Sequence, residues 1–493
     1  MIKKVLIANR GEIAIRIAKT LREMGVKTVS VYSDADKESL HIRKTDETYY
    51  LGPSKPSESY LNIEKIIEIA KKCKADAIHP GYGFLAENPK FAKECEKNGI
   101  IFIGPSSESL EKSGDKIFAR KAARECGVNI IPGSEVGTEN YEEFEKMADE
   151  IGYPLIIKAA LGGGGKGMRI VEKKEDLKSA FELARKEALE AFADGTLYVE
   201  KYLKNPRHIE IQIMGDKYKN YIHLFERECS IQRRHQKIIE EAPSPFMDEN
   251  LRKNMSEAAI EIAKKIGYYN AGTIEFLVDE NKNFYFLEIN ARLQVEHPVT
   301  EMITGKDLVR AQIQIASGEK IPWKKEEINL RGHAIECRIY AEDPLNNFAP
   351  SPGKIEFLSE PKGPYVRVDS GIYEGWEIPL FYDPLISKLI VWSEKREESL
   401  QKMREALKEY IIIGVKTIIP FLLKIIQNED FKKGNYHTNF LKEFDIEEEE
   451  EKEEKLLKVA ILGLLLENKG MEIKTKKESY NAWKIINRLR GLY

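Results

Sequence analysis

The chain of 493 residues predicts an α/β protein, α+β in part, with an N-terminal doubly wound parallel sheet. First, short apolar runs at residues 5–8, 27–32, 75–78 and 100–103 are separated by amphipathic helical patterns such as residues 12–24. Second, these runs are nearly continuous in Val, Ile, Leu and Ala, as expected for strands covered by helices on both faces of a parallel sheet. The length suggests roughly two to four domains.

A second α/β module follows. A helix is expected after Asp115, strands at 155–158 and 168–171 flank a glycine-rich stretch, and a helix at 174–193 precedes a strand at 197–200. A small module with its own glycine loop predicts a mobile lid. Residues 206–320 carry the longest polar strands. Residues 330–445 add more strands and a helix at 397–410, which predicts a C-terminal mixed β domain.

These patterns divide the chain into residues 1–114, a central domain at 115–325 with the lid at about 130–205, a C-terminal domain at 326–445 and a tail at 446–493. The tail starts with an acidic run at 447–454, which predicts a solvated linker, and continues with apolar segments that predict appended helices. We expect the tail either to dock a partner subunit or to cover the last domain.

Composition excludes several classes of protein. The net charge of −3 gives no basic field for nucleic acid. Five widely spaced cysteines without a CxxC pair predict neither a disulfide framework nor a zinc site, and favour a reducing cytoplasm. No segment reaches the length of a membrane span, and the first apolar run is too short for a signal-peptide core.

The glycine stretch at 162–165, followed by Lys166 and Gly167, suits close approach of backbone N–H groups to phosphate oxygens. It is not a Walker A loop, because Ala160 and Gly167 occupy positions that need Gly and Ser or Thr. A flexible hairpin is the alternative. Lys158, at the end of the preceding strand, favours phosphate binding.

Two acidic residues lie on a predicted hairpin, with strands at 273–277 and 284–290 and a turn at 279–283. Glu288 and Asn290 share one face of their strand, and Glu275 on the partner strand can face them. Two carboxylates and an amide oxygen suit Mg²⁺. The alternative is a surface hairpin with solvated acids.

The segment after the hairpin carries Arg292 and Glu296. An arginine can hold a planar oxyanion through two hydrogen bonds, and a glutamate nearby can act as its base. A simple salt bridge between them is the alternative. A further polar cluster spans residues 228–237. Its basic residues fit a surface loop as well, and no aromatic platform supports RNA binding.

These motifs, taken together, closely resemble the biotin carboxylase family within the ATP-grasp superfamily over about residues 1–445. The resemblance rests on residues 8–14, 79–88, 114–116, the glycine loop, 232–237, 294–298, 336–338 and 341–344. Several motifs in order are far more specific than any one of them.

The resemblance implies four sets of site residues. ATP would be surrounded by Lys116, Lys158, Gly164, Gly165, Glu200, Lys201, Leu203, His208, Gln232, His235, Glu275 and Glu288. Mg²⁺ or Mn²⁺ would be held by Glu275, Glu288 and Asn290. Bicarbonate would be bound by Lys237, Arg292, Gln294 and Val295, with Glu296 as its base. Biotin would lie near Tyr82 and Gly83, with Arg338 stabilising its enolate.

The implied enzyme is an ATP-hydrolysing ligase that carboxylates biotin, using bicarbonate through carboxyphosphate. The chain lacks an Ala-Met-Lys-Met-like attachment motif, so biotin is expected on a separate carrier or carboxyltransferase subunit. Residues 413–420 and the tail favour the A subunit of a two-subunit pyruvate carboxylase, with the biotin carboxylase of acetyl-CoA carboxylase or of 2-oxoglutarate carboxylase as alternatives. A homodimer is expected. The remoter alternatives are another ATP-grasp ligase and a nucleotide-sensing subunit.

Overall fold

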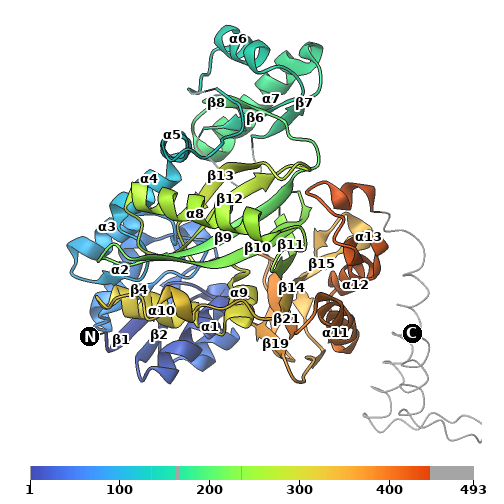
Figure 1. Cartoon of the computed structure of the whole chain (residues 1–493). Coiled ribbons are helices and arrows are strands. Elements are labelled where there is room, and N and C mark those ends of the chain that lie inside the picture. Colours follow the sequence, from blue (N-terminus) through green and yellow to red (C-terminus); the bar gives the residue numbers. More distant parts are fainter. Residues whose placement is uncertain (1, 135, 161–166, 235, 445–493) are drawn as a thin grey trace, which may run out of the picture.

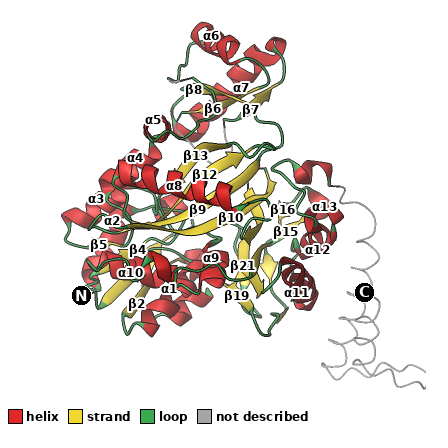
Figure 2. Ribbon diagram, viewed as in Figure 1, coloured by secondary structure: helices red, strands yellow, loops and turns green. Residues whose placement is uncertain are grey.

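The computed structural model describes residues 2–134, 136–160, 167–234 and 236–444. Gly164, Gly165, His235 and the predicted tail lie outside them. Figure 1 shows the lid standing above a body in which the N-terminal elements lie at the lower left and the C-terminal helices at the right of the long central sheet. Figure 2 shows how helices cover these sheets.

The N-terminal sheet is fully parallel, in the order β3-β2-β1-β4-β5. Its strands are β1 (Lys4–Ile7), β2 (Lys27–Ser33), β3 (Glu47–Gly52), β4 (Ala77–His79) and β5 (Ile101–Phe102). Its helices are α1 (Gly11–Glu23), α2 (Ile63–Lys72), α3 (Pro89–Lys97) and α4 (Ser107–Gly114). The predicted doubly wound sheet is confirmed. Edge strand β3 was not predicted, because its Glu, Thr and Tyr residues alternate between half-buried and exposed positions.

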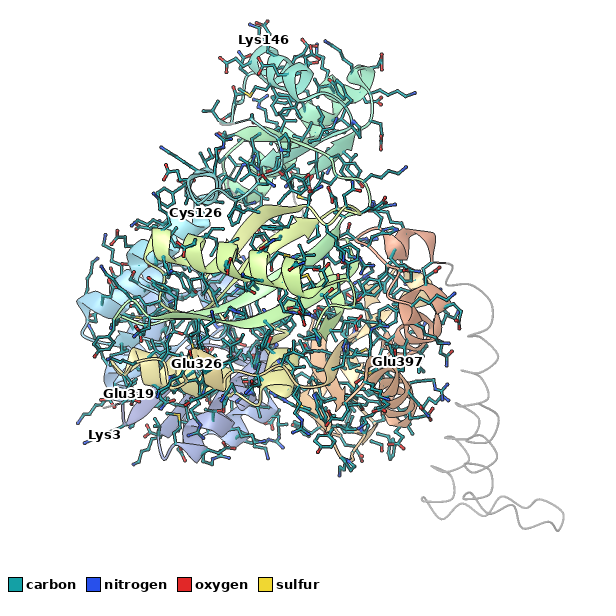
Figure 3. All side chains as sticks on the ribbon, in the orientation of Figure 1. Lys3, Cys126, Lys146, Glu319, Glu326 and Glu397 are labelled. Carbon is teal, nitrogen blue, oxygen red and sulfur yellow. The ribbon has the colours of Figure 1, made fainter. Side chains whose placement is uncertain are left out.

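The lid has a three-stranded antiparallel sheet, in the order β7-β6-β8. Its elements are α6 (Tyr141–Ile151), β6 (Leu155–Ala159), β7 (Arg169–Val171), α7 (Leu177–Phe192) and β8 (Leu197–Lys201), and α5 (Lys116–Glu125) joins it to the body. Its small core includes Phe144, Leu155, Ile157 and Phe181. Lys146 is exposed on α6 at the far end of the lid (Figure 3). The strands and helix predicted in this module are confirmed to within a few residues.

An eight-stranded antiparallel sheet forms the centre of the body, in the order β13-β12-β9-β10-β11-β14-β21-β19. Its strands are β9 (Arg207–Gly215), β10 (Tyr221–Arg233), β11 (Gln236–Ala242), β12 (Asn270–Val278), β13 (Phe284–Asn290), β14 (His333–Tyr340), β19 (Val366–Ser370) and β21 (Leu385–Ser393). Strand β11 pairs with β14, so this sheet runs without a break past residue 325. The predicted central and C-terminal domains therefore share one sheet.

Helices α8 (Glu249–Ile266), α9 (His297–Thr304) and α10 (Leu308–Ala316) pack beside this sheet, and α11 (Arg396–Glu409), α12 (Ile419–Gln427) and α13 (Glu429–Lys432) complete the C-terminal part. Three short antiparallel pairs join β15 (Glu342–Asp343) to β16 (Ala349–Pro350), β17 (Gly353–Lys354) to β20 (Glu377–Ile378), and β18 (Phe357–Ser359) to β22 (Ile411–Ile413). Among the described residues, no helix is both long and apolar enough to cross a membrane.

Candidate active site

The centre of the eight-stranded sheet carries charged side chains that are almost fully buried. Glu210 on β9 stands opposite Glu275 on β12 and opposite Arg227 on β10. The Nζ atom of Lys237 on β11 lies 2.6 Å from Glu210, 2.9 Å from Glu275 and 2.7 Å from Glu296. One ammonium group therefore joins three carboxylates, an arrangement that buried charges need in order to be tolerated.

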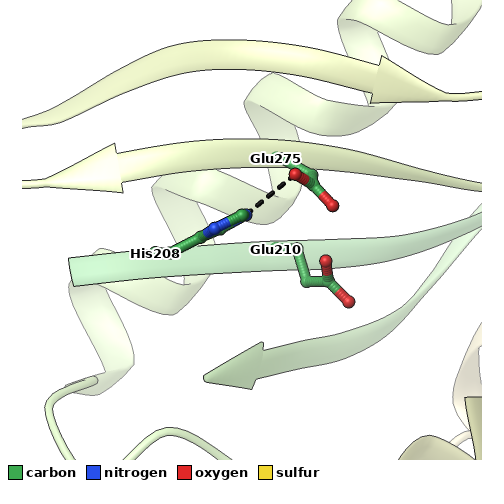
Figure 4. Close-up of side chains that lie close together, drawn as sticks. All are labelled: His208, Glu210 and Glu275. Atoms are coloured by element: carbon green, nitrogen blue, oxygen red, sulfur yellow. Dashed lines mark hydrogen bonds and ion pairs between the residues drawn. The ribbon is translucent and has the colours of Figure 1, made fainter. Parts of the chain in front are cut away.

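His208 extends this network along β9. Its Nε2 atom lies 2.8 Å from a Glu275 oxygen, and its Nδ1 atom lies 2.6 Å from the Gln232 amide nitrogen. Figure 4 shows the His208–Glu275 contact and Glu210 beside it. Burial alone would lower the pKa of His208, but the Glu275 carboxylate raises it above the usual value. The structure thus brings together four of the residues predicted to surround nucleotide and bicarbonate: His208, Gln232, Lys237 and Glu275.

Glu296 precedes α9 and is fully buried. Its two oxygens are held by different cations: Oε1 by Lys237 at 2.7 Å and Oε2 by Arg338 at 3.0 Å. Burial works to raise the pKa of Glu296, but the charges of Lys237 and Arg338 hold it below its usual value. Glu296 is therefore an ionised carboxylate at neutral pH, the form that can accept a proton.

Arg338, on β14, also binds a second carboxylate. Its Nε atom donates to Glu240 on β11 at 2.6 Å. Glu240 is opposite Glu336 in the β11–β14 register, and neither Glu336 oxygen has a hydrogen-bond partner among the described residues. Burial raises the pKa of Glu240 to about 7 and the pKa of Glu336 well above the usual value. Lys388, fully buried on β21 opposite Arg338, lies 3.3 Å from Glu12.

Arg292 is bound by other groups than Glu296. Its Nε atom donates to Glu87 at 2.7 Å, its Nη1 atom to Gln294 at 3.0 Å and its Nη2 atom to Asn290 at 3.3 Å. The alternative of a simple Arg292–Glu296 salt bridge is therefore wrong. The guanidinium is instead oriented by residues from two segments of the chain.

The predicted metal ligands lie on the β12–β13 hairpin, whose strands and turn are as expected. Glu275 is paired with Glu288 in the register, and the pKa of Glu288 is raised by burial and by the Glu275 charge. Asn290 lies two residues further along β13. Two paired carboxylates beside an amide oxygen fit a hard divalent cation. The carboxylate oxygens of Glu275 already accept from His208 and Lys237, so such a cation would share them.

Two further donor sets are geometrically possible. His208, Glu210 and Glu275 each offer one ligand atom within 4.8 Å of the others, and so do Glu210, Cys229 and Glu296. Both sets surround Lys237, whose ammonium already occupies the position of a cation. Burial raises the pKa of Cys229 well above its usual value, which disfavours the thiolate form in the metal-free chain. The carboxylates of the β12–β13 hairpin therefore remain the set that best fits a bound metal ion.

The lid and the body meet near Glu200 on β8. Its carboxylate is bound by Arg120 on α5 and by Lys158 on β6. Burial lowers the pKa of Lys116, with Lys158 adding to the effect. The Nζ atom of Lys201 donates to the backbone carbonyls of Gly152 and Tyr153, at 3.2 and 2.8 Å. Among the residues predicted to bind nucleotide, Lys158 and Glu200 contact each other. Lys201 instead donates to the lid backbone, and Leu203, two residues later, is half-buried.

Tyr82 and Gly83 lie on the loop after β4. The Tyr82 hydroxyl donates to Glu12, and the Lys388 ammonium lies 5.8 Å from the centre of the Tyr82 ring. Lys388 also donates to the backbone oxygen of Val295 at 2.8 Å. These contacts connect the predicted biotin residues to the predicted bicarbonate segment.

Sequence reasoning missed several buried charges of this site, and the exposed Glu87 that binds Arg292; the buried ones are Glu12, Arg120, Glu210, Arg227, Glu240, Glu336 and Lys388. A charged residue inside an otherwise apolar strand was the available signal, as at Glu210 in the fully buried β9. Pattern alone did not reveal which partners would compensate each charge.

A cavity of about 260 Å³ lies beside the start of β9. It is lined by Asn205, Arg207, Phe246, Val278, Asp279, Glu280, Asn435, Tyr436 and His437, none of which is a predicted site residue. Arg207 is stacked between Phe246 and Tyr436 and hydrogen-bonded to Gly434. This arginine is fully engaged, so we assign the cavity no chemistry.

Three family models together match most of the chain. Residues 1–110 match the model of the biotin carboxylase N-terminal domain, residues 115–324 that of the carbamoyl-phosphate synthase L chain ATP-binding domain, and residues 336–443 that of the biotin carboxylase C-terminal domain. The chain is 56% identical over 444 residues to the pyruvate carboxylase A subunit of Methanothermobacter thermautotrophicus, covering 90% of each. The chain belongs to the biotin carboxylase family.

Further relatives in this family include biotin carboxylase 1 of Bacillus subtilis, which is 50% identical and covers 90% of this chain and 99% of its own. A solved biotin carboxylase of Campylobacter jejuni, in a β-γ-ATP complex, superposes with a TM-score of 0.88 at 50% identity, covering 90% and 99%. The biotin carboxylase domain dimer of Hydrogenobacter thermophilus 2-oxoglutarate carboxylase, with MgADP, ADP and bicarbonate, has a TM-score of 0.88 at 48% identity, covering 91% and 100%. The family assignment and fold class expected from sequence are confirmed.

The two ends of the buried network around Glu296 lie among different groups of predicted site residues. Lys237, Glu296 and Arg338 form one chain of contacts across β11 and β14. The Lys237 end reaches Glu275 and the hairpin, and the Arg338 end lies in the same buried network as Lys388 and Tyr82. Such an arrangement can hold an anion between two cations and pass a proton to a carboxylate.

Proposed function

We propose that this chain catalyses the first half-reaction of a biotin-dependent carboxylase: ATP-dependent carboxylation, by bicarbonate, of biotin carried on a separate protein. The observation that carries the proposal is Glu296, an ionised buried carboxylate held between Lys237 and Arg338. One side of this base leads to the nucleotide residues and the other to the biotin residues. The division into domains at 1–114, 115–325, 326–445 and 446–493 belongs to the same proposal.

Bicarbonate would bind near Lys237, Arg292, Gln294 and Val295. Arg292 is held in place by Glu87 and Gln294, so its guanidinium is oriented before an anion arrives. Glu296 would take the bicarbonate proton, since its carboxylate is ionised before bicarbonate arrives. The deprotonated anion then attacks the γ-phosphate of ATP and forms carboxyphosphate.

Nucleotide would lie between lid and body, near Lys116, Lys158, Glu200, Lys201, Leu203, His208 and Gln232, with Gly164, Gly165 and His235 contributing from outside the described residues. Glu275, Glu288 and Asn290 would hold Mg²⁺ or Mn²⁺, which when bound offsets the phosphate charge. Lys158 would release part of its contact with Glu200 to reach phosphate.

Biotin would approach Tyr82 and Gly83, with Arg338 stabilising the negative charge that develops on the ureido oxygen. Carboxyphosphate yields CO2 and phosphate, phosphate takes the proton from the biotin N1 atom, and N1 captures CO2. The burial of Arg338 keeps water away from its guanidinium and strengthens this interaction.

We favour the A subunit of a pyruvate carboxylase as the role of the chain, supported by its 56% identity to a protein of that name. The biotin carboxylase of acetyl-CoA carboxylase or of 2-oxoglutarate carboxylase is the second candidate. A homodimer in the cytoplasm, joined by a carrier and carboxyltransferase subunit, completes the proposal. Testing the purified complex with pyruvate, acetyl-CoA and 2-oxoglutarate identifies the acceptor.

The half-reaction is tested by ATP hydrolysis that depends on bicarbonate and free biotin. We expect biotin to stimulate the wild-type chain, and Arg338→Ala to lower the biotin-dependent rate by about 10²–10³-fold. Lys265→Met, which removes only an exposed contact with Glu125, is the matched control and should behave as wild type. A wild-type chain that biotin does not stimulate, with Arg338→Ala behaving alike, would end the proposal.

A further inference from the structure

Two loops at one end of β14 and β21 expose large apolar side chains. Leu380 is 70% exposed and Phe381 is 54% exposed on the loop between β20 and β21. Leu345, in the loop between β15 and β16, is 47% exposed. Single exposed apolar residues are ordinary, but a group of them on neighbouring loops marks an interaction surface.

The β20–β21 loop is firmly held from behind. The Tyr382 hydroxyl donates to the backbone oxygen of Ser54 at 2.7 Å, and the Arg10 guanidinium lies 4.3 Å from the centre of the Tyr382 ring. The rings of Tyr60 and Phe84 also contact Tyr382, at 5.5 and 6.3 Å between centres. The exposure of Leu380 and Phe381 is therefore a fixed feature of the loop.

The two loops are joined to each other and to the proposed biotin site. The Ala341 N–H donates to the Pro384 oxygen at 2.9 Å, which ties the start of one loop to the end of the other. Phe84, which contacts Tyr382, directly follows Tyr82 and Gly83.

Strand β14 ends before the first of these loops, strand β21 begins after the second, and the two strands pair with each other. Leu385 pairs with Tyr340 in the β14–β21 register, and Lys388 pairs with Arg338. The exposed side chains therefore rim the end of the sheet at which Tyr82, Gly83 and Arg338 lie.

We propose that Leu345, Leu380 and Phe381 form the docking surface for the carrier domain that presents biotin, an inference that rests on the proposed function. The position of these loops beside the proposed biotin site identifies the carrier domain as the binding partner. Biotin joined to a lysine reaches no further than its own flexible arm, so the carrier must rest on the rim around Arg338. An apolar rim on anchored loops loses little conformational entropy on binding and buries apolar area in the contact.

The test compares free biotin with biotin on protein. The probe is the biotin-containing protein of the same organism, purified on monomeric avidin. The double variant Leu380→Ser/Phe381→Ser should raise the KM for this protein at least tenfold, with the rate on free biotin unchanged. Leu183→Ser/Leu189→Ser, on the exposed face of lid helix α7, is the matched control and should change neither.

Each other outcome overturns the inference. An unchanged KM for the biotin-containing protein excludes these residues from docking. If sedimentation of the double variant also shows that a dimer dissociates, the surface formed by Leu345, Leu380 and Phe381 binds a second copy of the chain. If the thermal stability of the double variant falls instead, another part of the same chain covers this surface. Equal losses with free and protein-bound biotin make the loop part of the biotin site. Failure of the proposed function is distinct, because free biotin would then not stimulate the wild-type chain.

Discussion

Two groups of buried charges lie on neighbouring strands and meet at Glu296, yet they hold their protons differently. We call the first the Lys237 cluster: His208, Glu210, Lys237, Glu275 and Glu296. The second is the Glu336 cluster: Glu12, Glu240, Glu336, Arg338 and Lys388. Burial is the common force in both clusters, and it disfavours the charged form of each carboxyl group.

In the Lys237 cluster, the neighbouring cations affect the carboxyl pKa values more strongly than burial does. Against the effect of burial, Lys237 and His208 hold the pKa of Glu275 well below its usual value, and the pKa of Glu296 is also lowered. In the Glu336 cluster, burial affects the carboxyl pKa values more strongly than the neighbouring cations do. The pKa values of Glu12 and Glu240 rise to about 7, and burial also raises that of Glu336 well above its usual value. Arg338 is shared with Glu296, which leaves too little positive charge for three carboxyls.

The difference indicates two uses of one sheet. In the Lys237 cluster, the lowered pKa values of Glu275 and Glu296 favour their ionised forms. In the Glu336 cluster, the raised pKa values of the three carboxyl groups favour proton binding next to Arg338. Substitutions in each cluster test whether this contrast holds.

The largest effect is expected for Lys237→Met, which leaves the carboxyl groups of Glu210, Glu275 and Glu296 without their shared cation. Removing one partner from a buried ionic network costs about 3–5 kcal/mol of unfolding free energy. We also expect kcat for biotin-dependent ATP hydrolysis to fall by about 10²–10³-fold. Urea unfolding at pH 7 measures the first effect; if Lys237→Met is as stable as the exposed control Lys265→Met, the contrast fails.

Lys388→Met should cost less, about 1–3 kcal/mol. Its neighbours Glu12 and Glu336 can bind protons in place of the lost ammonium group, whereas the lowered pKa values of Glu275 and Glu296 oppose proton binding beside Lys237. Proton uptake is easier at low pH, so the loss should be smaller at pH 6 than at pH 8 in urea unfolding. A loss that equals that of Lys237→Met at both pH values contradicts the assignment of protons to the Glu336 cluster.

The pair Glu336→Gln and Glu275→Gln should change stability in opposite directions. The pKa of Glu336 is raised on folding, so its contribution is full below about pH 4.5 and is lost as pH rises through the folded value. Glu336→Gln cannot ionise, so its free energy of unfolding should rise relative to that of the wild type between pH 5 and pH 8.

Glu275 has the reverse sign. Its pKa is lowered on folding, so its contribution is present above about pH 4.5 and disappears as pH falls through the folded value. Glu275→Gln should be about 1.5–3 kcal/mol less stable than wild type at pH 7, with a gap that closes in acid. Thermal unfolding of the metal-free chain across pH 3–8 measures both variants, and two curves of the same sign would refute the comparison.

The smallest effect is expected for Tyr82→Phe, which removes the hydrogen bond to Glu12 at the edge of the Glu336 cluster. We expect a loss of about 1 kcal/mol and a rise in the KM for free biotin, with the KM for ATP unchanged. Tyr49→Phe removes a comparable tyrosine–glutamate contact, with Glu47, and is the control. Equal kinetics in the two variants would separate Tyr82 from the biotin site.

Elements defined by local pattern were predicted well from sequence. The β12–β13 hairpin follows from alternation of acids with Phe and Leu, and its turn from Asp279, whose Oδ1 atom accepts from the backbone N–H groups of Asn281 and Asn283. The N-terminal strands follow from apolar runs. By contrast, the junction of β11 with β14 joins residues about a hundred positions apart, and no local pattern marks it.

The sequence by itself determined the family, the parallel N-terminal sheet, the lid elements and the kinds of residue that the chemistry requires. Only the tertiary structure decided which charges compensate one another. Lys237 meets carboxylates from three separate segments, and Arg292 turns to Glu87, 205 positions away, instead of to Glu296. Pairing and protonation depend on burial and on distances between strands, which arise only when the sheet is assembled.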